Sequence, residues 1–477
     1  MISGVKNYRH SLIGVSVAIW ITIAAGVFLI FISSSKQLGL VSGMVFILVG
    51  LYPFVRACMR REFDAFEIIN MFVLYMIVHI GIQGLIGIKY DSKFLFYDPD
   101  SDHLDILKLK TFSYSTLALL FLYLGYYSRF GNRWLKVLPW LNFDWGKGKV
   151  VICFFIYFVI SQMAIAIFTT KFGSLGEAKF GTNPAKIIDN VIQSGTTEHI
   201  RVFFHFFWTI FYVSCIYKFV KKKSIWGHIT VIFCFSEAFI MFLLFGGKSP
   251  VLFAIGTYII ARHYLKKPIS LKMYVLLFIG IFFLYPFLIF IQINGIYSNW
   301  SDLVNYYNSA LKNPTELLLP FLGREAGFTP FALFIDSIDS GRSLELGRPM
   351  TFLFYFFIPR VLWEGKPLPF SLTFDEEYAG RSVAGANAPS LPGELYVNFH
   401  LVGVVLGFLL LGILMKLCYQ CLIKRNHNKS SLLIYLPMVL FTPNILEAGT
   451  MVITLYLVAL LPIMFFLWFV KSKGQGI

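Results

Sequence analysis

The chain has 477 residues, of which 57% are hydrophobic and only 14% are charged, and its mean hydropathy is +0.71. Soluble domains carry about 25% charged residues, and 52 Phe with 9 Trp exceed what a water-soluble core of this size holds. This composition excludes a soluble enzyme, a transcription factor and a secreted disulfide scaffold. We therefore expect an all-α polytopic membrane protein that is solvated largely by lipid.

The net charge of +16 at pH 7 is distributed in a way that argues against nucleic-acid binding. Lys and Arg lie in short clusters between apolar runs, as the positive-inside rule expects of cytoplasmic loops. With the N-terminus placed inside, the inside segments hold 24 of the 41 basic residues. The charge is therefore interpreted as an orientation signal, and no nucleic-acid partner is expected.

Twelve segments approach the roughly 20 apolar residues that a membrane span needs. An even number of spans places both termini in the cytoplasm, in agreement with the charge count. The weakest assignments are the pair around 225–265 and the short span at 431–446. The expected spans are 12–32, 38–57, 67–88, 111–128, 150–169, 202–219, 225–245, 250–265, 272–293, 396–416, 431–446 and 450–470.

The spans divide the chain into three parts. Residues 1–293 form nine spans with short loops, residues 294–395 form one large extracytoplasmic loop, and residues 396–477 form three further spans. A loop of about 100 residues is much longer than a connection needs, and such loops are usually functional. We therefore expect the active site in the loop 294–395.

Two short elements are predicted within this loop. Residues 313–316 (NPTE) have the features of a helix start, and the helix that follows carries Arg324 and Glu325. Residues 350–358 are apolar but too few to span a bilayer, so we expect an interfacial or re-entrant segment. The loop closes at Glu394, directly before the next span.

The polar residues of the loop fit an anion-binding, acid/base site at the outer membrane surface. Arg324, Arg360 and Lys366 provide positive charge for a diphosphate, because guanidinium forks match phosphate oxygens and Lys adds a point charge. Glu394 lies at a helix start near the membrane face, where a carboxylate can act as a general base.

Structural interpretations of the same residues stay open. Arg360 and Lys366 are also placed to snorkel in an aromatic belt at the membrane interface. Arg324 and Glu325 equally fit a solvated helix face. Glu394 equally fits an N-terminal acid that is favoured by the helix dipole.

Two further acids lie in or near the expected spans. Glu237 is in the middle of a span, where a charge costs at least ~2.5 kcal/mol on insertion scales, so it is a functional candidate by default. A protonated or paired structural acid is the alternative for Glu237. Glu447 lies in a short turn before the last span, where a surface acid is the simplest interpretation.

Four stretches in the C-terminal half combine Gly, Trp, Arg, Lys and Glu in a recognisable order. They are 244–250 (LFGGKSP), 321–330 (FLGREAGFTP), 354–367 (FYFFIPRVLWEGKP) and 389–403 (PSLPGELYVNFHLVG). Together they resemble the Wzy-type oligosaccharide repeat-unit polymerases, the O-antigen and common-antigen polymerase group. The resemblance covers roughly residues 240–450. Two positions depart from it: Lys248 stands where the family usually has Arg, and Leu446 precedes Glu447 where some members carry Arg-Glu.

The resemblance implies a polymerase of undecaprenyl-diphosphate-linked oligosaccharides in a bacterial inner membrane, with a fold like that of C-type glycosyltransferases. One glycan is transferred from its lipid diphosphate to the terminal hydroxyl of an incoming lipid-linked repeat unit, on the periplasmic or outer face. The donor carries its own leaving group, so neither a nucleotide cofactor nor a metal ion is expected. The implied partners are the bilayer, a chain-length regulator and a flippase.

The resemblance also suggests a role for each site residue. Fixed positive charge assists departure of the diphosphate, and Arg324, Arg360, Lys366 and Lys248 are the candidates for it. Glu394 is the first candidate for the base, and Glu325 is the second. Supporting positions are Glu447, Tyr396, Asn398 and Glu237.

Three other functions stay open on the sequence. An O-antigen ligase has a similar architecture and the same donor, but Glu394 stands where that family suggests a His. A metal-dependent C-type glycosyltransferase would use Asp98, Asp100 or Asp102 with a divalent ion. A lipid-linked-oligosaccharide flippase would show internal repeats and midplane polar residues, whereas only Glu237 lies deep in the membrane.

Overall fold

The computed structural model describes most of the chain as helices. The described residues are 35–60, 64–85, 101–129, 143–172, 197–220, 225–245, 249–270, 300–312, 327–356, 389–424 and 428–471, with parts of 273–288 and 358–378. Within these residues the β-structure is limited to one isolated bridge between Trp145 and Lys471. This is the secondary structure expected in lipid, where a helix satisfies its own backbone hydrogen bonds.

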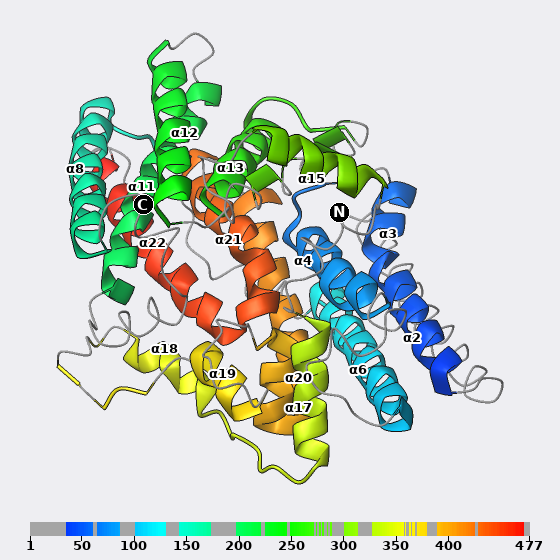
Figure 1. The fold of residues 1–477 in the computed structure, drawn as a ribbon. Helices are drawn as coiled ribbons and strands as arrows, with labels where there is room; N and C mark the ends of the chain where they lie inside the picture. Colours follow the sequence, from blue (N-terminus) through cyan, green and yellow to red (C-terminus); the bar gives the residue numbers. More distant parts are fainter. Residues whose placement is uncertain are drawn as a thin grey trace.

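Figure 1 shows the helices as a bundle with α20, α21 and α22 at its centre. In chain order the elements are α2 (Ser35–Gly50), α3 (Tyr52–Arg60), α4 (Ile68–Met76), the π-helical turn η1 (Ile77–Ile82), α6 (Ser101–Tyr127), α8 (Lys147–Phe172), α11 (Thr197–Val220), α12 (Ile225–Phe245), α13 (Ser249–Leu265), α15 (Trp300–Lys312), α17 (Phe328–Asp339), the 3₁₀ turn η2 (Pro349–Thr351), α18 (Phe352–Tyr355), α19 (Phe370–Tyr378), α20 (Leu391–Tyr419), the π-helical turn η3 (Gln420–Lys424), α21 (Lys429–Ala448) and α22 (Thr450–Val470).

Seven segments of the described residues are long and apolar enough to cross a membrane, and each overlaps a span predicted from the sequence. The protein is therefore an all-α membrane protein with several spans. The seven are Leu38–Ala57, Ile68–Leu85, Lys147–Ile167, Phe203–Val220, Leu391–Lys424, Lys429–Ala448 and Thr450–Val470.

The other five predicted spans have different outcomes. Those at 111–128, 225–245 and 250–265 coincide with the helices α6, α12 and α13. Helix α6 begins ten residues before the predicted span, and the apolar pattern missed these residues because the first turns of the helix are polar. The span at 12–32 lies outside the described residues, as does most of 272–293. The total of twelve spans and the orientation of the termini stay predictions.

Helix α20 packs along α6 and also contacts α17, α21 and α4. The two long helices approach closely because small residues face backbone at the crossing. A Cβ at Gly412 would lie less than 3 Å from the carbonyl oxygen of Leu122, and one at Gly125 would clash in the same way with Leu409. Small residues at helix crossings are typical of membrane proteins, where close packing replaces the hydrophobic effect between helices.

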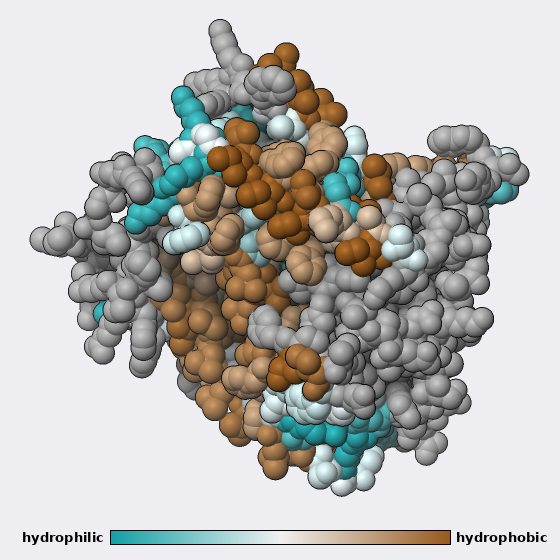
Figure 2. Space-filling view, turned by 90° about the vertical axis from the view of Figure 1, so that its left-hand side faces the viewer, coloured by the Kyte–Doolittle hydropathy of each residue, from teal (hydrophilic) through white to brown (hydrophobic). Residues whose placement is uncertain are grey.

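The two ends of the bundle carry different elements. In Figure 1, α17, α18 and α19 lie at the lower end, whereas α15 lies at the upper end near α3. The boundary of the predicted outer loop at residue 294 stays a prediction. Of that loop, the described residues around the lower end are 327–356, parts of 358–378, and 389–390. Figure 2 shows one face of the molecule, where hydrophobic residues form a broad area between hydrophilic groups above and below.

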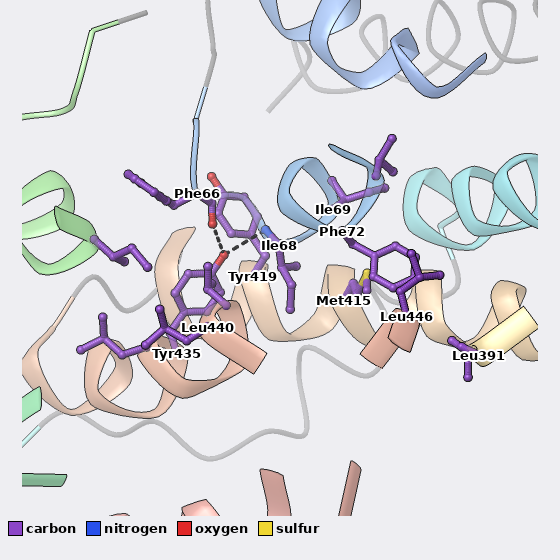
Figure 3. Close-up of a cluster of buried hydrophobic side chains, with 14 of the residues drawn as sticks. Phe66, Ile68, Ile69, Phe72, Leu391, Met415, Tyr419, Tyr435, Leu440 and Leu446 are labelled. Carbon is purple, nitrogen blue, oxygen red and sulfur yellow. Dashed lines mark hydrogen bonds between the residues drawn. The ribbon is translucent and has the colours of Figure 1, made fainter. Parts of the chain in front are cut away.

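Tyrosine hydroxyls fasten the buried start of α4 to the C-terminal end of α20 and to α21. Tyr435 donates to the carbonyl of Phe66 at 2.8 Å and accepts the N–H of Ile68 at 3.1 Å, as Figure 3 shows. Buried polar groups need such partners, since an unsatisfied one costs free energy.

Asp64, next to this contact, accepts hydrogen bonds from two helices, α13 and α20. Its Oδ2 accepts the hydroxyls of Tyr264 at 2.9 Å and Tyr419 at 2.7 Å, and its Oδ1 lies 3.2 Å from Nε2 of His263. Nδ1 of His263 accepts the N–H of Ile269 at 3.0 Å, so Nε2 carries the proton. Burial alone raises the pKa of Asp64, but the hydrogen bonds from His263 and Tyr419 outweigh it and hold the pKa below its ordinary value.

Candidate functional site

The first two turns of α20 form a half-helix, residues 391–398, that folds back on the rest of α20. The backbone leaves the helical region at Phe399 (φ −140°, ψ 20°) and His400 (φ 54°, ψ −153°). A Cβ at Gly403 would lie less than 3 Å from the carbonyl oxygen of Leu395. In a straight helix, Leu395 and Gly403 would lie about 12 Å apart along the axis, because they are eight residues apart. The chain therefore reverses at Phe399 and His400. The predicted start of a span at 396 falls inside the half-helix.

The half-helix begins with its own cap. The side chain of Ser390 accepts the N–H of Gly393 at 3.2 Å. Pro392 has no backbone N–H, so it leaves no unsatisfied donor in the first turn. A Cβ at Gly393 would clash with the ring of Phe334 on α17, so glycine lets the half-helix pack closely there. These contacts fix the direction in which Glu394 points.

Glu394 is 2% exposed, and its carboxylate caps the N-terminus of the neighbouring helix α22. Oε2 accepts the N–H of Thr450 at 2.8 Å, and Oε1 accepts the hydroxyl of the same residue. Gly449 has φ 58°, and a Cβ there would lie less than 3 Å from Oε2. Only glycine therefore fits between α21 and α22, and the dipole of α22 favours the negative charge.

Glu447 lies in the last turn of α21 and is buried at 6% exposure, so the expectation of a surface acid is wrong. Its carboxylate accepts the hydroxyl of Tyr75 on α4. Its backbone carbonyl accepts the N–H of Ser390 at 2.8 Å. Glu447 thus joins α4, α21 and the start of the half-helix.

The end of the half-helix holds a loop of residues 341–348. Nδ2 of Asn398 donates to the carbonyl of Glu394 at 2.7 Å, and its Oδ1 accepts the N–H of Gly347 at 2.7 Å. The N–H of Glu345 donates to the carbonyl of Val397 at 3.0 Å. The backbone leaves the helical region directly after Asn398, and the loop 341–348 donates to the carbonyl of Val397 there.

Backbone strain is concentrated around this half-helix. A residue other than glycine that is held at positive φ costs free energy and is typical of functional sites, whereas glycine adopts positive φ at little cost. The described residues include six at positive φ, three of them glycines, and all six lie in the loop 341–348, at the two ends of the half-helix or at the Glu394 contact. They are Gly341, Leu346, Gly347, Ser390, His400 and Gly449. The strain locates the candidate site independently of any sequence motif.

A compact ion-pair network braces the loop 341–348. Arg348 donates to Glu345 at 2.7 Å and to Glu377 at 3.1 Å, and Arg342 donates to Glu377 at 3.2 Å. The hydroxyl of Tyr378 donates to Glu345 at 2.8 Å, and the guanidinium of Arg342 lies 3.8 Å from the centre of the Tyr378 ring. Burial and the carboxylate of Glu345 raise the pKa of Tyr378 above its ordinary range. The positive charges of Arg342 and Arg348 are therefore balanced by the carboxylates of Glu345 and Glu377.

A narrow pocket of about 10 Å³, roughly the room for one water molecule, lies beside Glu394. Glu394 and Thr450 form its polar end, and most of its other lining residues are apolar. The lining comprises Pro349, Phe352, Leu353, Phe370, Pro389, Glu394, Ala448, Thr450, Met451 and Thr454. Its lining combines apolar side chains with two convergent polar groups, Glu394 and Thr450, as small-molecule sites do, but a ligand larger than water needs the lining residues to move apart.

The elements η2 and α18 form one wall of this pocket. Phe352 and Phe356 are buried and cluster with Val458 of α22, whereas Phe354 is 80% exposed. Lys366 is buried at 3% exposure, and its Nζ donates to the carbonyl of Phe356 at 3.0 Å, 5.7 Å from two ring centres. In this structure Lys366 fastens the wall of the pocket.

The structure brings Glu394, Tyr396, Asn398 and Glu447 together among the residues predicted from the sequence. Glu237 is buried on α12, which packs on α11 and α13. The other predicted residues, Arg324, Glu325, Arg360 and Lys248, lie outside the described residues, as do Asp98 and Asp100. Within the described ranges, no group of three His, Cys, Asp or Glu side chains is arranged to hold a metal ion.

Sequence reasoning missed Thr450, Tyr75, His400 and the loop 341–348. Each depends on contacts between segments far apart in the chain, or on backbone angles that cannot be predicted from the residue types. Gly449 beside Thr450 and Gly403 after the half-helix were the available signals, since each glycine marks a close approach of the chain.

Comparisons with protein-family models, with curated proteins and with solved structures find no match to this chain.

Proposed function

We propose that this protein is a glycosyltransferase that joins undecaprenyl-diphosphate-linked oligosaccharide repeat units into a surface polysaccharide: O-antigen, common antigen or capsule. The proposal places it in the inner membrane of a bacterium, with the site on the outer face. The observation that supports it best is the carboxylate of Glu394 at the polar end of a largely apolar pocket. A lipid-linked substrate has the same two parts, an apolar chain and a charged head.

In the proposed reaction, the terminal hydroxyl of the acceptor attacks C1 of the donor sugar. The new C1–O bond forms as the bond between C1 and the diphosphate oxygen breaks, and undecaprenyl diphosphate leaves. The proton of the hydroxyl passes to Glu394, which must lie within hydrogen-bond reach of it. Thr450 orients the carboxylate, and the acceptor hydroxyl takes the place of the Thr450 hydroxyl at Oε1.

The leaving diphosphate needs positive charge, because charge develops on its bridging oxygen. The sequence resemblance assigns this to Arg324, Arg360 and Lys248 together with Lys366. Since Lys366 is bonded to the carbonyl of Phe356, its part in this proposal is to shape the pocket, and the other three remain the candidates for the diphosphate.

The test of this proposal is Glu394→Gln in a strain that lacks the gene. Glutamine keeps the size of the side chain, accepts the N–H of Thr450 through its oxygen and donates to the Thr450 hydroxyl through its nitrogen. We expect wild type to restore a ladder of glycan lengths on gels and Glu394→Gln to leave single repeat units at equal protein level. Asp144→Asn, an exposed acid paired with Lys429, is the control and should restore the ladder. A full ladder from Glu394→Gln would show that Glu394 is not the base.

A further inference from the structure

His400 occupies a backbone conformation that is essentially reserved for glycine. Its φ of 54° and ψ of −153° hold a branched side chain where only a hydrogen is comfortable. Ser390 is similarly strained, but its side chain caps the half-helix. His400 is exposed and fills no core position, so core packing does not account for a histidine in this strained conformation.

A hydrogen bond to Tyr396 fixes the orientation of the imidazole. Nε2 lies 3.0 Å from the hydroxyl of Tyr396, which is fully buried, and the two ring centres are 4.6 Å apart. Tyr114 also stacks on Tyr396, with ring centres 5.7 Å apart. A buried phenol must donate its hydrogen, and the acceptor present is Nε2. The neutral imidazole therefore carries its own hydrogen on Nδ1.

The neighbouring cations are already paired with acids. Lys110 lies 2.6 Å from Asp339, and Arg348 lies 2.7 Å from Glu345. Within the described part of the chain, Nδ1 of His400 takes part in no hydrogen bond. The Nδ1–H is thus an exposed donor held by a strained backbone at one end of the half-helix that carries Glu394.

We infer that His400 binds an anionic oxygen of the substrate, a phosphate or diphosphate oxygen, through Nδ1–H. Tyr396 is its positioning residue, because the phenol selects the tautomer that exposes this hydrogen. The inference rests on the proposed function for the identity of the substrate. The anion site itself rests on the strain, the exposure and the hydrogen bond of His400.

Three substitutions separate binding from folding. His400→Gly removes the donor and relieves the backbone strain, but it also takes away the acceptor of the Tyr396 hydroxyl. The two effects on stability oppose each other, so the protein should melt close to wild type. His400→Asn places an amide N–H where Nδ1–H was, whereas the longer amide of His400→Gln does not. Leu346→Gly is the control: Leu346 is strained at φ 48° and 75% exposed, but offers no donor.

The measurement is binding of undecaprenyl diphosphate to the full-length protein in lipid nanodiscs, with undecaprenol and inorganic diphosphate as parallel probes. Loss of a hydrogen bond to a charged group should weaken binding about 10- to 100-fold. We expect that loss for His400→Gly and His400→Gln, and near-wild-type binding for His400→Asn and Leu346→Gly. Binding of undecaprenol should be unaffected in all of them. Equal weakening with inorganic diphosphate would identify the diphosphate alone as the ligand, and weakening with the lipid probe only would require the chain as well.

The inference is wrong if His400→Gly binds undecaprenyl diphosphate as wild type does, or if His400→Asn is as weak as His400→Gly. The proposed function fails separately. A wild-type protein that binds undecaprenyl diphosphate but does not lengthen the glycan would refute the polymerase and leave the anion site in place.

Discussion

The fold-back of the half-helix can be tested by adding one methyl group, with Gly403→Ala. The new Cβ would lie less than 3 Å from the carbonyl oxygen of Leu395, a backbone atom that cannot rotate away. Either the half-helix moves outward, or the reversal at Phe399 and His400 opens. Either change disturbs Glu394, because the half-helix is short and rigid.

The magnitude follows from two opposing effects. Alanine in place of glycine inside a helix gains about 1 kcal/mol in propensity. Forcing a methyl group into a packed site costs about 1–3 kcal/mol and sometimes more, and here the obstructing atom is backbone. We expect a net loss of up to about 2 kcal/mol and a half-unfolding temperature in detergent below that of a glycine-to-alanine change without the clash.

Gly148→Ala is the matched control. Gly148 is also helical, and a Cβ there would meet nothing within 4 Å, so it gains the propensity without the clash. Thermal unfolding of the two variants in one detergent isolates the contact with Leu395. If Gly403→Ala unfolds at the same temperature as Gly148→Ala, or higher, the half-helix does not fold back on α20 and the geometry of the site is wrong.

Three other substitutions test the contacts around the site and at the far end of α20. Gly449→Ala should lose about 2–3 kcal/mol, because it combines strain at φ 58° with a clash against Glu394, and glycan lengthening should stop; normal glycan ladders would contradict the cap on α22. Asp64→Asn should lose about 1.5–3 kcal/mol of stability through its charge-assisted hydrogen bonds. Because the folded pKa of Asp64 is lowered, its contribution is present above the unfolded value of about 3.9 and is lost as the pH falls through the folded pKa. Unfolding of wild type below about pH 4 should therefore converge on that of Asp64→Asn, and a constant difference between them would refute this. Lys366→Met should lower the yield of folded protein, since it leaves the carbonyl of Phe356 without its donor; Lys366→Met protein that folds normally and loses only diphosphate binding would instead restore the sequence-based role.

Much of the helical framework is predictable because lipid imposes a strong rule on composition. A span needs about 20 apolar residues whatever it packs against, so the spans at 38–57 and 450–470 agree with the structure almost to the residue. Helix α6 departs from this rule. Its first turns carry Asp105, Lys108 and Lys110, which extend the helix beyond the apolar segment.

The geometry of the site depends on information that hydropathy does not carry. The half-helix and the body of α20 are one continuous apolar segment in the sequence, and the reversal at His400 arises from tertiary contacts of Gly403 and Asn398. The sequence marked Glu394 as a helix-start acid, but its partner Thr450 lies 56 residues away along the chain. Glu447 was misplaced for the same reason: the turn after it consists of Gly449 alone, so the helix continues past the acid.

The central claim is that this chain lengthens a lipid-linked glycan, and reconstitution tests it most directly. Purified protein in liposomes would receive an undecaprenyl-diphosphate-linked repeat unit with EDTA present and no nucleotide sugar. The account predicts products of two or more repeats together with free undecaprenyl diphosphate, and no lengthening with Glu394→Gln. Repeat units that stay single with wild type, or that only change leaflet, would contradict it.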